Sequence, residues 1–591
     1  MPLEAPSHMP EPDRPPRRAR PAPTADALPH EIVVLKFGSS ILASEAKIAD
    51  AVHEVYREVR NGRRVVVVCS AMGDTTDRLA QRAGEISDKP HPAAYAALLA
   101  VGESHSSAQV TLAIEAAGIP ATLLDPAQID LRTTGDPVNA EPESMAAGPV
   151  RHELNMGNVV VLPGFAGRDR RGFTTLLGRG GSDLTALFVA HSVGAARCRL
   201  VKDVDGWYDA DPKQPGARKF STLTYDDALA SPAKVAQPKC VKYAADHGLI
   251  LEIGALGSET PSVIGAEETR KVPQGGPRRP VRVALLGLGT VGGGVMRHML
   301  AEPAMYDVRS ILVRDPSKYA DKLEHPEVLT TSIDDVFATD PELVIEVIGG
   351  TGLAGELINR ALDAGCNVVT ANKALMARDG VALRALASER GVMLLDSAAV
   401  GGGVPMLETV DRIARDHEIA AISGVLNGTT NFILGRMARG TTYAEALEEA
   451  QRLGYAEADP TADVAGFDAA QKLCLLCRLA FDPEMPESAV EVSGIESLAD
   501  GAPALERGFA RRLVARASRR DDGTIGARVA LETVREGSDL ARARDESAVL
   551  IVHLADGRRE TVIGRGAGRW PTAESVFADV AQAARRIDAR A

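Results

Sequence analysis

The sequence has no long apolar run, no excess of basic residues and few cysteines. No stretch approaches the roughly 18–20 apolar residues of a membrane-spanning helix, so we expect no membrane association. Lys and Arg number 67 against 80 Asp and Glu. The resulting net charge of −13 argues against a nucleic-acid-binding protein, because such proteins carry a basic surface.

The six cysteines are scattered, and only Cys474 and Cys477 lie close together, in the apolar stretch KLCLLCRLAF. A zinc or redox CxxC needs a second ligand pair or a strand–turn–helix context, and this pair has neither. We therefore predict buried core thiols. Reduced cysteines and no secretory signal predict a cytoplasmic protein of bacterial type.

A chain of 591 residues is too long for one hydrophobic core, so several domains are expected. Residues 1–30, rich in Pro, Ala and Arg, predict a disordered tail. Residues 266–280 are charged and rich in Pro and Gly, which predicts a linker between two halves. In both halves strand-like runs such as EIVVLKF and VRVALLG alternate with helical stretches. This alternation predicts an α/β fold with parallel sheets covered by helices.

The second half opens with an apolar strand over residues 281–286, and GLGTVG at 287–292 begins the helix behind it. A GxGxxG in this position allows a tight turn and brings backbone N–H groups close to a dinucleotide pyrophosphate. The alternative is a glycine-rich turn without a ligand. The predicted cofactor contacts are Gly287, Gly289, Thr290, Val291 and Gly292.

The next predicted strand ends in LVRDPSK, which bears on the choice of cofactor. An acidic residue here favours the 2′-hydroxyl of NAD, whereas an arginine favours the 2′-phosphate of NADP. Arg314 comes first, Asp315 follows and Lys318 is near. NADP is therefore predicted through Arg314 and Lys318, with NAD as the alternative.

Four later segments carry a family resemblance: VVTANKALMA, DSAAVGGGVPMLETV, GVLNGTTNFILGRM and, at 450–472, AQRLGYAEADPTADVAGFDAAQK. The last fits A-x3-G-Y-A-x2-D-P-x2-D-V-x-G-x-D-x3-K at every defined position. Residues 281–591 thus resemble homoserine dehydrogenase. The resemblance implies a Rossmann domain over 281–412, completed by about 562–591, and an α+β catalytic and dimerisation domain over 413–561.

The implied reaction is the reversible, NAD(P)-dependent reduction of L-aspartate 4-semialdehyde to L-homoserine. In this family pattern Lys472 is the proton donor, and Lys373 lies beside the nicotinamide and the substrate. Glu457 and Asp468 hold the substrate, Asp463 supports them, and Thr429 is either a substrate contact or a turn residue. Further cofactor contacts are implied at Gly349 and at Gly566 and Gly568, in a GAG turn that returns to the cofactor.

The residues themselves agree with this chemistry. Hydride delivery to an aldehyde builds negative charge on its oxygen, so a positioned acid or cation is required there. Asp468 and Lys472 are four residues apart, which puts them on one helical face. The alternative is a surface ion pair. A carboxylate is also the natural partner of the substrate ammonium group. Asp459, before Pro460, is expected to cap or turn the chain.

One departure concerns a monovalent cation, Na⁺ or K⁺. In DSAAVGGGVP, Ser397 stands where the family usually has a glutamate. The implied site keeps only backbone oxygens at Val400, Gly402 and Val404, and serine is a poorer, uncharged ligand. We therefore expect a weak site.

The first half resembles aspartate kinase, of the amino-acid kinase family, over residues 31–265. The segments LKFGSSIL, VVVVCSAMGDTTDRL, AVGESHSSAQ, LLGRGGSDLTALF and VKDVDGWYDADPK occur in family order. The resemblance implies transfer of a phosphoryl group from ATP, with Mg²⁺, to L-aspartate. The nucleophile is an ionised carboxylate, so alignment and charge neutralisation suffice. The implied site residues are Lys36 for phosphate, Arg179 and Glu103 for aspartate, Asp183 and Ser70 around them, and Asp203, Tyr208, Lys213 and Lys234 near the nucleotide.

The kinase motifs also depart from the family. Ser39 and Ile41 replace a glycine and a hydroxyl residue of the phosphate loop, Lys202 replaces a threonine, and Gln237 replaces a histidine. A Cβ at position 39 crowds the phosphate if the backbone needs a positive φ. Two alternatives follow: a fused kinase and dehydrogenase, or an active dehydrogenase whose kinase-like half is catalytically dead and serves assembly or ligand sensing.

No ACT regulatory domain is expected, because only the 266–280 linker separates the halves and the chain ends soon after the GAG turn. We therefore predict no feedback inhibition by threonine or lysine through such a domain. The expected partners are small-molecule substrates and further copies of the chain, in a homodimer or higher homo-oligomer.

Overall fold

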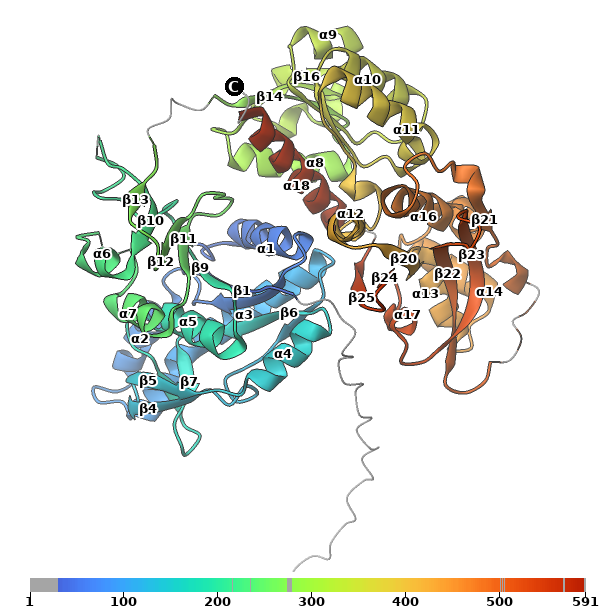
Figure 1. Cartoon of the computed structure of the whole chain (residues 1–591). Coiled ribbons are helices and arrows are strands. Elements are labelled where there is room, and N and C mark those ends of the chain that lie inside the picture. The colour runs from blue at the N-terminus through green and yellow to red at the C-terminus, as the bar shows by residue number, and fades with distance from the viewer. Residues whose placement is uncertain are drawn as a thin grey trace, which may run out of the picture.

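A computed structural model describes residues 30–588, except 215, 234, 274–278, 500, 502, 504, 567 and 568. The predicted tail up to residue 29, Lys234 and Gly568 lie outside the described residues. Figure 1 shows two α/β halves, one blue to green and one yellow-green to red, that meet along helices α1 (Glu45–Arg60) and α18 (Arg569–Asp588).

The first half is built on a nine-stranded sheet of order β13-β10-β12-β11-β9-β1-β2-β6-β3. Its centre is parallel and its strands are rich in buried valine, as in the run RVVVVC of β2. The strands are β1 (Ile32–Phe37), β2 (Arg64–Cys69), β3 (Ala121–Leu123), β6 (Val159–Pro163), β9 (Arg197–Val201), β10 (Phe220–Thr224), β11 (Leu251–Gly254), β12 (Ser262–Gly265) and β13 (Arg270–Lys271).

Helices cover both faces of this sheet. Side chains of α1 and α3 pack on one face, and side chains of α4, α5 and α7 pack on the other. The first half also contains a separate four-stranded sheet of order β5-β4-β7-β8. These elements are α2 (Thr75–Ile86), α3 (Pro92–Ala116), α4 (Ala147–Asn155), α5 (Gly181–Val193), α6 (Tyr225–Ala230), α7 (Pro238–His247), β4 (Arg132–Asp136), β5 (Asn139–Ser144), β7 (Ala166–Arg168) and β8 (Thr174–Leu176).

The second half begins with an all-parallel six-stranded sheet of order β16-β15-β14-β17-β18-β19. Helix α18 comes from the C-terminal end of the chain and packs beside α8 on this sheet. The elements are β14 (Val281–Leu286), β15 (Tyr306–Leu312), β16 (Leu329–Thr330), β17 (Leu343–Glu346), β18 (Asn367–Thr370), β19 (Leu394–Leu395), α8 (Thr290–Ala301), α9 (Ile333–Ala338), α10 (Leu353–Asp363) and α11 (Lys373–Arg390).

A second six-stranded sheet, of order β21-β23-β22-β20-β24-β25 and mostly antiparallel, completes this half. Helix α16 packs against the sheet and against α12, so it joins the two sheets of this half. The elements are α12 (Met406–Asp416), α13 (Gly428–Met437), α14 (Tyr443–Arg452), α15 (Thr461–Val464), α16 (Phe467–Ala480), α17 (Asp539–Arg542), β20 (Ile419–Val425), β21 (Val490–Val492), β22 (Phe509–Arg519), β23 (Ile525–Arg535), β24 (Ser547–Leu554) and β25 (Arg559–Arg565). The α/β class and the three-part architecture predicted from the sequence are confirmed.

All six cysteines are buried and free, which confirms the prediction of core thiols. Cys474 and Cys477 lie within α16 in the core of the second half. No helix among the described residues is long and apolar enough to cross a membrane.

Candidate active sites

Three charged side chains meet where α11 and α16 face each other. Lys373 follows β18 closely, at the carboxyl edge of the all-parallel sheet of the second half, and its ammonium contacts Asp468 Oδ1. Lys472 Nζ lies 2.7 Å from Asp468 Oδ2 and donates to the Leu426 carbonyl at 2.8 Å. One carboxylate therefore holds two ammonium groups and leaves one net positive charge.

Burial and charge oppose each other at this cluster. Burial alone would raise the pKa of Asp468, but Lys472 and Lys373 outweigh it and hold that pKa far below its ordinary value. Asn427 donates to Asp468 Oδ2 at 2.9 Å and to Asp463 Oδ1 at 2.6 Å. Burial raises the pKa of Asp463, although the Asn427 hydrogen bond opposes the shift. Asn427 was not predicted; its only sequence signal is its place as the N-cap of α13.

The other carboxylates of this region behave differently. Asp459 accepts hydrogen bonds from the amide and hydroxyl of Thr461, as expected of a turn residue. Glu457 is exposed on the preceding loop, and no contact with the lysines is found among the described residues. Thr429 donates to the Tyr455 carbonyl at 2.6 Å, so its hydroxyl already holds the loop.

The glycine motif has the geometry of a phosphate cradle. Gly287 has a φ of +100°, and Gly289 is the N-cap of α8. A Cβ on Gly292 would lie 2.2 Å from the Gly287 carbonyl oxygen, so only glycine permits this close contact between helix and turn. The cradle fits a dinucleotide pyrophosphate at the helix N-terminus. Thr290 and Val291 occupy the first turn of the same helix.

A buried glutamate, Glu346, fixes the turn that follows β17. Glu346 ends β17, is fully buried, and accepts hydrogen bonds from the amides of Ile348 and Gly349 at 2.9 Å. It also accepts from Thr370 Oγ1, and Asn372 donates to the Gly350 carbonyl. Sequence reasoning missed Glu346, which looked like one more residue of the strand LVIEVIGG.

Near the predicted binding site of the cofactor 2′ group, Asp315 forms hydrogen bonds within the protein, whereas Arg314 is exposed. Asp315 accepts hydrogen bonds from the amide and hydroxyl of Ser317 and caps a 3₁₀ turn. Lys318 lies 3.8 Å from Asp315. Arg314 is exposed and has no hydrogen bond or ion pair with the described residues. It is therefore available to a ligand.

Ser397 is engaged by protein groups. Its hydroxyl donates to Asp579 Oδ1 at 2.8 Å and accepts from Arg60 Nη2 of the first half at 3.0 Å. A Na⁺ or K⁺ bound to this oxygen would face a guanidinium, so Ser397 and its surroundings do not fit a metal cation. The Val404 carbonyl accepts from the Met406 amide at 2.7 Å. Val400 and Gly402 belong to the same tight loop, where Gly402 packs against Gly566.

A second charged cluster lies in the first half, at the carboxyl ends of β1 and β9. Lys36 Nζ is 2.6 Å from Asp183 Oδ1, and Lys202 Nζ is 2.7 Å from Asp183 Oδ2. Burial lowers the pKa of Lys36, although Asp183 opposes it. Burial would raise the pKa of Asp183, but the two lysines hold it below its ordinary value. The cluster again carries one net positive charge.

Glu103 faces this cluster from α3. Burial raises the pKa of Glu103 to about 7, and its Oε2 has no hydrogen-bond partner among the described residues. Ser70 is buried at the end of β2, and its carbonyl accepts from Ser106 at 2.6 Å. Arg179 is exposed between Gly178 and Gly180, both of which have φ in the left-handed region.

Three of the predicted nucleotide residues, Asp203, Tyr208 and Lys213, lie in the described segment that follows Lys202. Tyr208 lies in a cavity of about 280 Å³ with Val204, Pro212 and Val235, and its hydroxyl donates to Asp205 at 2.9 Å. Asp203 and Lys213 are exposed on the same loop.

Two sequence departures, Ser39 and Ile41, fit the local structure without strain. Ser39 does not have a positive φ, so its Cβ fits the backbone without strain. Ile41 packs in the hydrophobic core.

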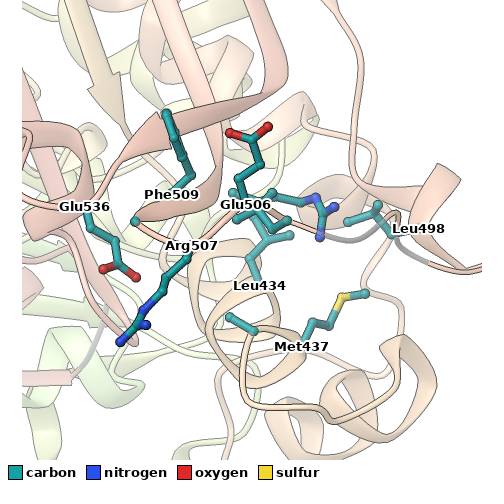
Figure 2. Close-up of a pocket in the computed structure, with 11 residues that line it drawn as sticks. Leu434, Met437, Leu498, Glu506, Arg507, Phe509 and Glu536 are labelled. Carbon is teal, nitrogen blue, oxygen red and sulfur yellow. The ribbon is translucent and has the colours of Figure 1, made fainter.

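A larger cavity, of about 490 Å³, lies away from both clusters, at the C-terminal end of α13 (Figure 2). Leu434 and Met437 line one side, and Arg507, Phe509 and Glu536 line the other. None of the clustered lysines or carboxylates lines it.

Comparison with known proteins assigns families to these parts. Residues 405–581 match the family "Homoserine dehydrogenase", residues 287–395 match "Homoserine dehydrogenase, NAD binding domain", and residues 31–252 match "Amino acid kinase family". The homoserine dehydrogenase of Corynebacterium glutamicum is 39% identical over 334 residues, which are 53% of this chain and 74% of that protein. The Bacillus subtilis homoserine dehydrogenase is also 39% identical, over 318 residues, 51% of this chain and 72% of that protein.

A solved structure gives the same result. The crystal structure of a homoserine dehydrogenase from Thiobacillus denitrificans matches with a TM-score of 0.50 and 36% identity. The match covers 53% of this chain and 74% of that one.

Proposed function

We propose a function from one premise, that the chain belongs to the homoserine dehydrogenase family. The second half reduces L-aspartate 4-semialdehyde to L-homoserine, and the first half is an aspartate kinase that forms 4-phospho-L-aspartate from ATP and L-aspartate. The observation that carries the first assignment is the sharing of Asp468 by two lysines at the carboxyl edge of the dinucleotide-binding sheet.

The charged cluster suits carbonyl reduction. Bound NAD(P)H supplies the hydride, and negative charge then develops on the aldehyde oxygen. Lys472 gives that oxygen a proton, and Lys373 adds positive charge beside it. Asp468 contacts both ammonium groups and fixes their positions. Asp463, with Glu457 from the loop above it, receives the substrate ammonium group, and Thr429 borders the substrate.

The cofactor is held by the glycine cradle and by Gly349 and Gly566, with Gly568 in the same family turn. NADP is the preferred form, because Arg314 is available for a 2′-phosphate whereas Asp315 is committed to its own turn. Lys318 adds charge at this point.

The test of the dehydrogenase is NADPH oxidation with L-aspartate 4-semialdehyde. In Lys472→Ala we expect kcat to fall by about 10²- to 10⁴-fold, the typical contribution of a general acid. The thermal unfolding midpoint should fall but stay above the assay temperature, because Lys373 still pairs with the buried Asp468. Arg452→Ala, which removes an exposed cation from the same half, should leave the rate intact. An unchanged rate in Lys472→Ala would overturn the assignment.

The kinase assignment rests on the Lys36–Asp183–Lys202 cluster. The aspartate carboxylate attacks without a base, so two lysines, backbone N–H groups and ATP-bound Mg²⁺ are sufficient to neutralise the phosphoryl charge. Lys202, absent from the family pattern, adds a second lysine. Arg179 binds the α-carboxylate, Glu103 binds the α-ammonium and Ser70 lines the site.

The nucleotide half of the kinase site uses the Tyr208 cavity, with Asp203, Lys213 and Lys234 near the phosphates. Trapping of aspartyl phosphate with hydroxylamine tests this activity. Hydroxamate formation that is lost in Arg179→Ala supports a kinase. No hydroxamate from the unchanged protein would instead support the alternative, a kinase-like half that serves assembly.

The two activities are not consecutive, because aspartyl phosphate must first be reduced to the semialdehyde by a separate enzyme. Direct transfer of an intermediate between the halves is therefore not part of the proposal. A homodimer or higher homo-oligomer is proposed, and sedimentation of the intact chain tests it.

A further inference from the structure

One arginine of the kinase half contacts charged and polar groups of the dehydrogenase half. Arg60, at the end of α1, lies within hydrogen-bond or ion-pair distance of three groups that all belong to the other half. Its guanidinium contacts Asp579 of α18, donates to Ser397 Oγ at 3.0 Å, and lies 3.2 Å from Glu408 Oε1 of α12. The arginine side chain is 11% exposed and the Asp579 side chain is fully buried.

These groups depend on the arginine for their charge balance. Neither Glu408 oxygen has a hydrogen-bond partner among the described residues, so Arg60 is its nearby counter-charge. Burial raises the pKa of Glu408 to about 7, and Arg60 opposes this shift. The neighbouring cation Arg384 is engaged by Asp396 at 2.6 Å. Without Arg60, Asp579 and Glu408 would be two buried carboxylates beside one serine.

The three partners of Arg60 lie in or next to the loop from Ser397 to Pro405. Asp579 Oδ2 accepts from the Ser397 amide at 2.9 Å, so α18 and this loop are tied together. Glu408 stands in the first turn of α12, directly after the loop.

From this loop, direct packing leads to the catalytic groups. Helix α12 packs on α16, which carries Asp468 and Lys472. A Cβ on Gly402 would lie 2.5 Å from the Gly566 carbonyl oxygen, so the loop also abuts the segment that returns to the cofactor. A shift of the loop would therefore reach the site from two directions.

We propose that the kinase half supplies, through Arg60, the fixed positive charge that holds the 397–405 loop of the dehydrogenase, in place of a metal cation. Arg60 is then a positioning residue of the dehydrogenase, and this dehydrogenase works without Na⁺ or K⁺. The inference rests on the proposed dehydrogenase activity.

A cavity makes the proposal testable by chemical rescue. Arg60 lines a space of about 380 Å³ at the junction of the halves, together with Arg57, Arg197 and Arg585. Truncation of Arg60 would open its guanidinium position to this space, so a free guanidinium ion can enter it.

The experiment compares the intact chain with Arg60→Ala and with Arg63→Ala as the matched control. Arg63 lies just after the same helix, and its ion pairs with the described residues are to Glu31 and Glu58 of its own half. In Arg60→Ala we expect kcat/KM for semialdehyde reduction to fall by about 100-fold, the typical effect of a small misplacement at a reacting centre. Millimolar guanidinium chloride should restore most of this activity and raise the unfolding midpoint of Arg60→Ala only. Arg60→Lys should retain part of the activity.

The second arm replaces Na⁺ and K⁺ by tetramethylammonium at constant ionic strength. The unchanged protein should keep both its rate and its unfolding midpoint. A requirement for Na⁺ or K⁺, an unchanged rate in Arg60→Ala, or a loss that guanidinium does not restore would each overturn the proposal. If Arg60→Ala fails to fold, Arg60→Lys and the cation replacement decide the question. Absence of NADPH oxidation by the unchanged protein would refute the proposed function instead, and the unfolding midpoints would still test the role of Arg60.

Discussion

Glu103 is the acidic side chain that faces the Lys36–Asp183–Lys202 cluster, and it is poised to change charge near neutral pH. Burial raises the pKa of Glu103 to about 7, far above an exposed glutamate. In its ionised form it can pair with the α-ammonium of aspartate, whereas the protonated form carries no charge for this purpose.

The kinase should therefore show a pH dependence set by Glu103. Because the pKa is raised, the side chain is mostly neutral below about pH 7, so kcat/KM for aspartate should fall as pH drops through that value. Glu103→Gln should weaken aspartate binding and remove this limb of the profile. Glu115→Gln, exposed on the same helix, should keep it. A flat profile of the unchanged protein between about pH 6 and 8 would contradict the assignment.

Arg314 should set the choice between the two nicotinamide cofactors. A charged hydrogen bond to a 2′-phosphate contributes about 1.5–3 kcal/mol, so Arg314→Ala should raise KM for NADPH by about 10- to 100-fold. KM for NADH should barely change, because NADH lacks that phosphate. Arg309→Ala, exposed on the preceding strand and paired with Asp307, is the control. Equal losses with both cofactors would contradict this role.

Local spacing could predict only part of these clusters. Asp468 and Lys472 lie one helical turn apart, so the pair follows from the sequence alone. Lys373 is 95 residues from Asp468, and their contact exists only because α11 and α16 pack together. Lys202 looked like a defect in the kinase motif, yet it completes the pairing of Asp183. Sequence patterns report neighbours along an element, whereas packing decides neighbours between elements.

At the scale of elements, helix α8 offers a comparison between two adjacent glycines. Gly292 faces the turn that follows β14, and a Cβ there would lie 2.2 Å from the Gly287 carbonyl oxygen. Gly293 is one position further along the same helix, and a Cβ placed on it meets no described atom within 4 Å apart from its chain neighbours and the nearby backbone of its own helix.

We expect opposite results from alanine at these two positions. Gly292→Ala should displace α8 from the turn, so KM for NADPH should rise by about tenfold or more, as expected when a phosphate site is misplaced. Gly293→Ala should leave KM unchanged and raise the free energy of unfolding by about 0.4–1 kcal/mol, because alanine lowers the entropy of the unfolded chain. Steady-state kinetics and urea unfolding measure both effects. Similar behaviour of the two variants would show that the close contact has no role.

Elements with two buried faces were the ones that the sequence predicted. Strands β2 and β14 read RVVVVC and VRVALL, and both are almost wholly buried. The hairpin of β4 and β5 was not predicted. Most of its residues face solvent, and its sequence RTTGD–NAEPES is accordingly polar. It also contains a proline. Without a buried face, no hydrophobic period marks such strands.

At the scale of the whole molecule, the two halves are joined by a buried carboxylate between two histidines. Glu574 of α18 lies 2.7 Å from His53 Nδ1 of the kinase half and 2.9 Å from His298 Nε2 of α8. His298 also stacks on Phe577 at 4.6 Å between ring centroids. His53 and Glu574 are 521 residues apart, so no sequence pattern announces the contact.

Glu574 should make the unfolding of the two halves cooperative. Burial alone would raise its pKa, but the hydrogen bonds from His298 and His53 lower the pKa of Glu574 to about 2. A carboxylate with a lowered pKa stabilises the fold above the pKa of the unfolded chain, and this contribution is lost as pH falls toward the folded value. Removal of one partner from such a buried charged pair lowers the free energy of unfolding by about 3–5 kcal/mol.

In Glu574→Gln we therefore expect a lower unfolding midpoint at pH 7, with the single calorimetric transition of the intact chain separating into two. The difference between variant and unchanged protein should shrink as pH falls from about 4.5 toward 2, because the carboxylate then becomes neutral in the unchanged protein as well. Glu389→Gln, exposed on the dehydrogenase half, should show neither effect. If the two transitions were already separate in the unchanged protein, the halves would unfold independently.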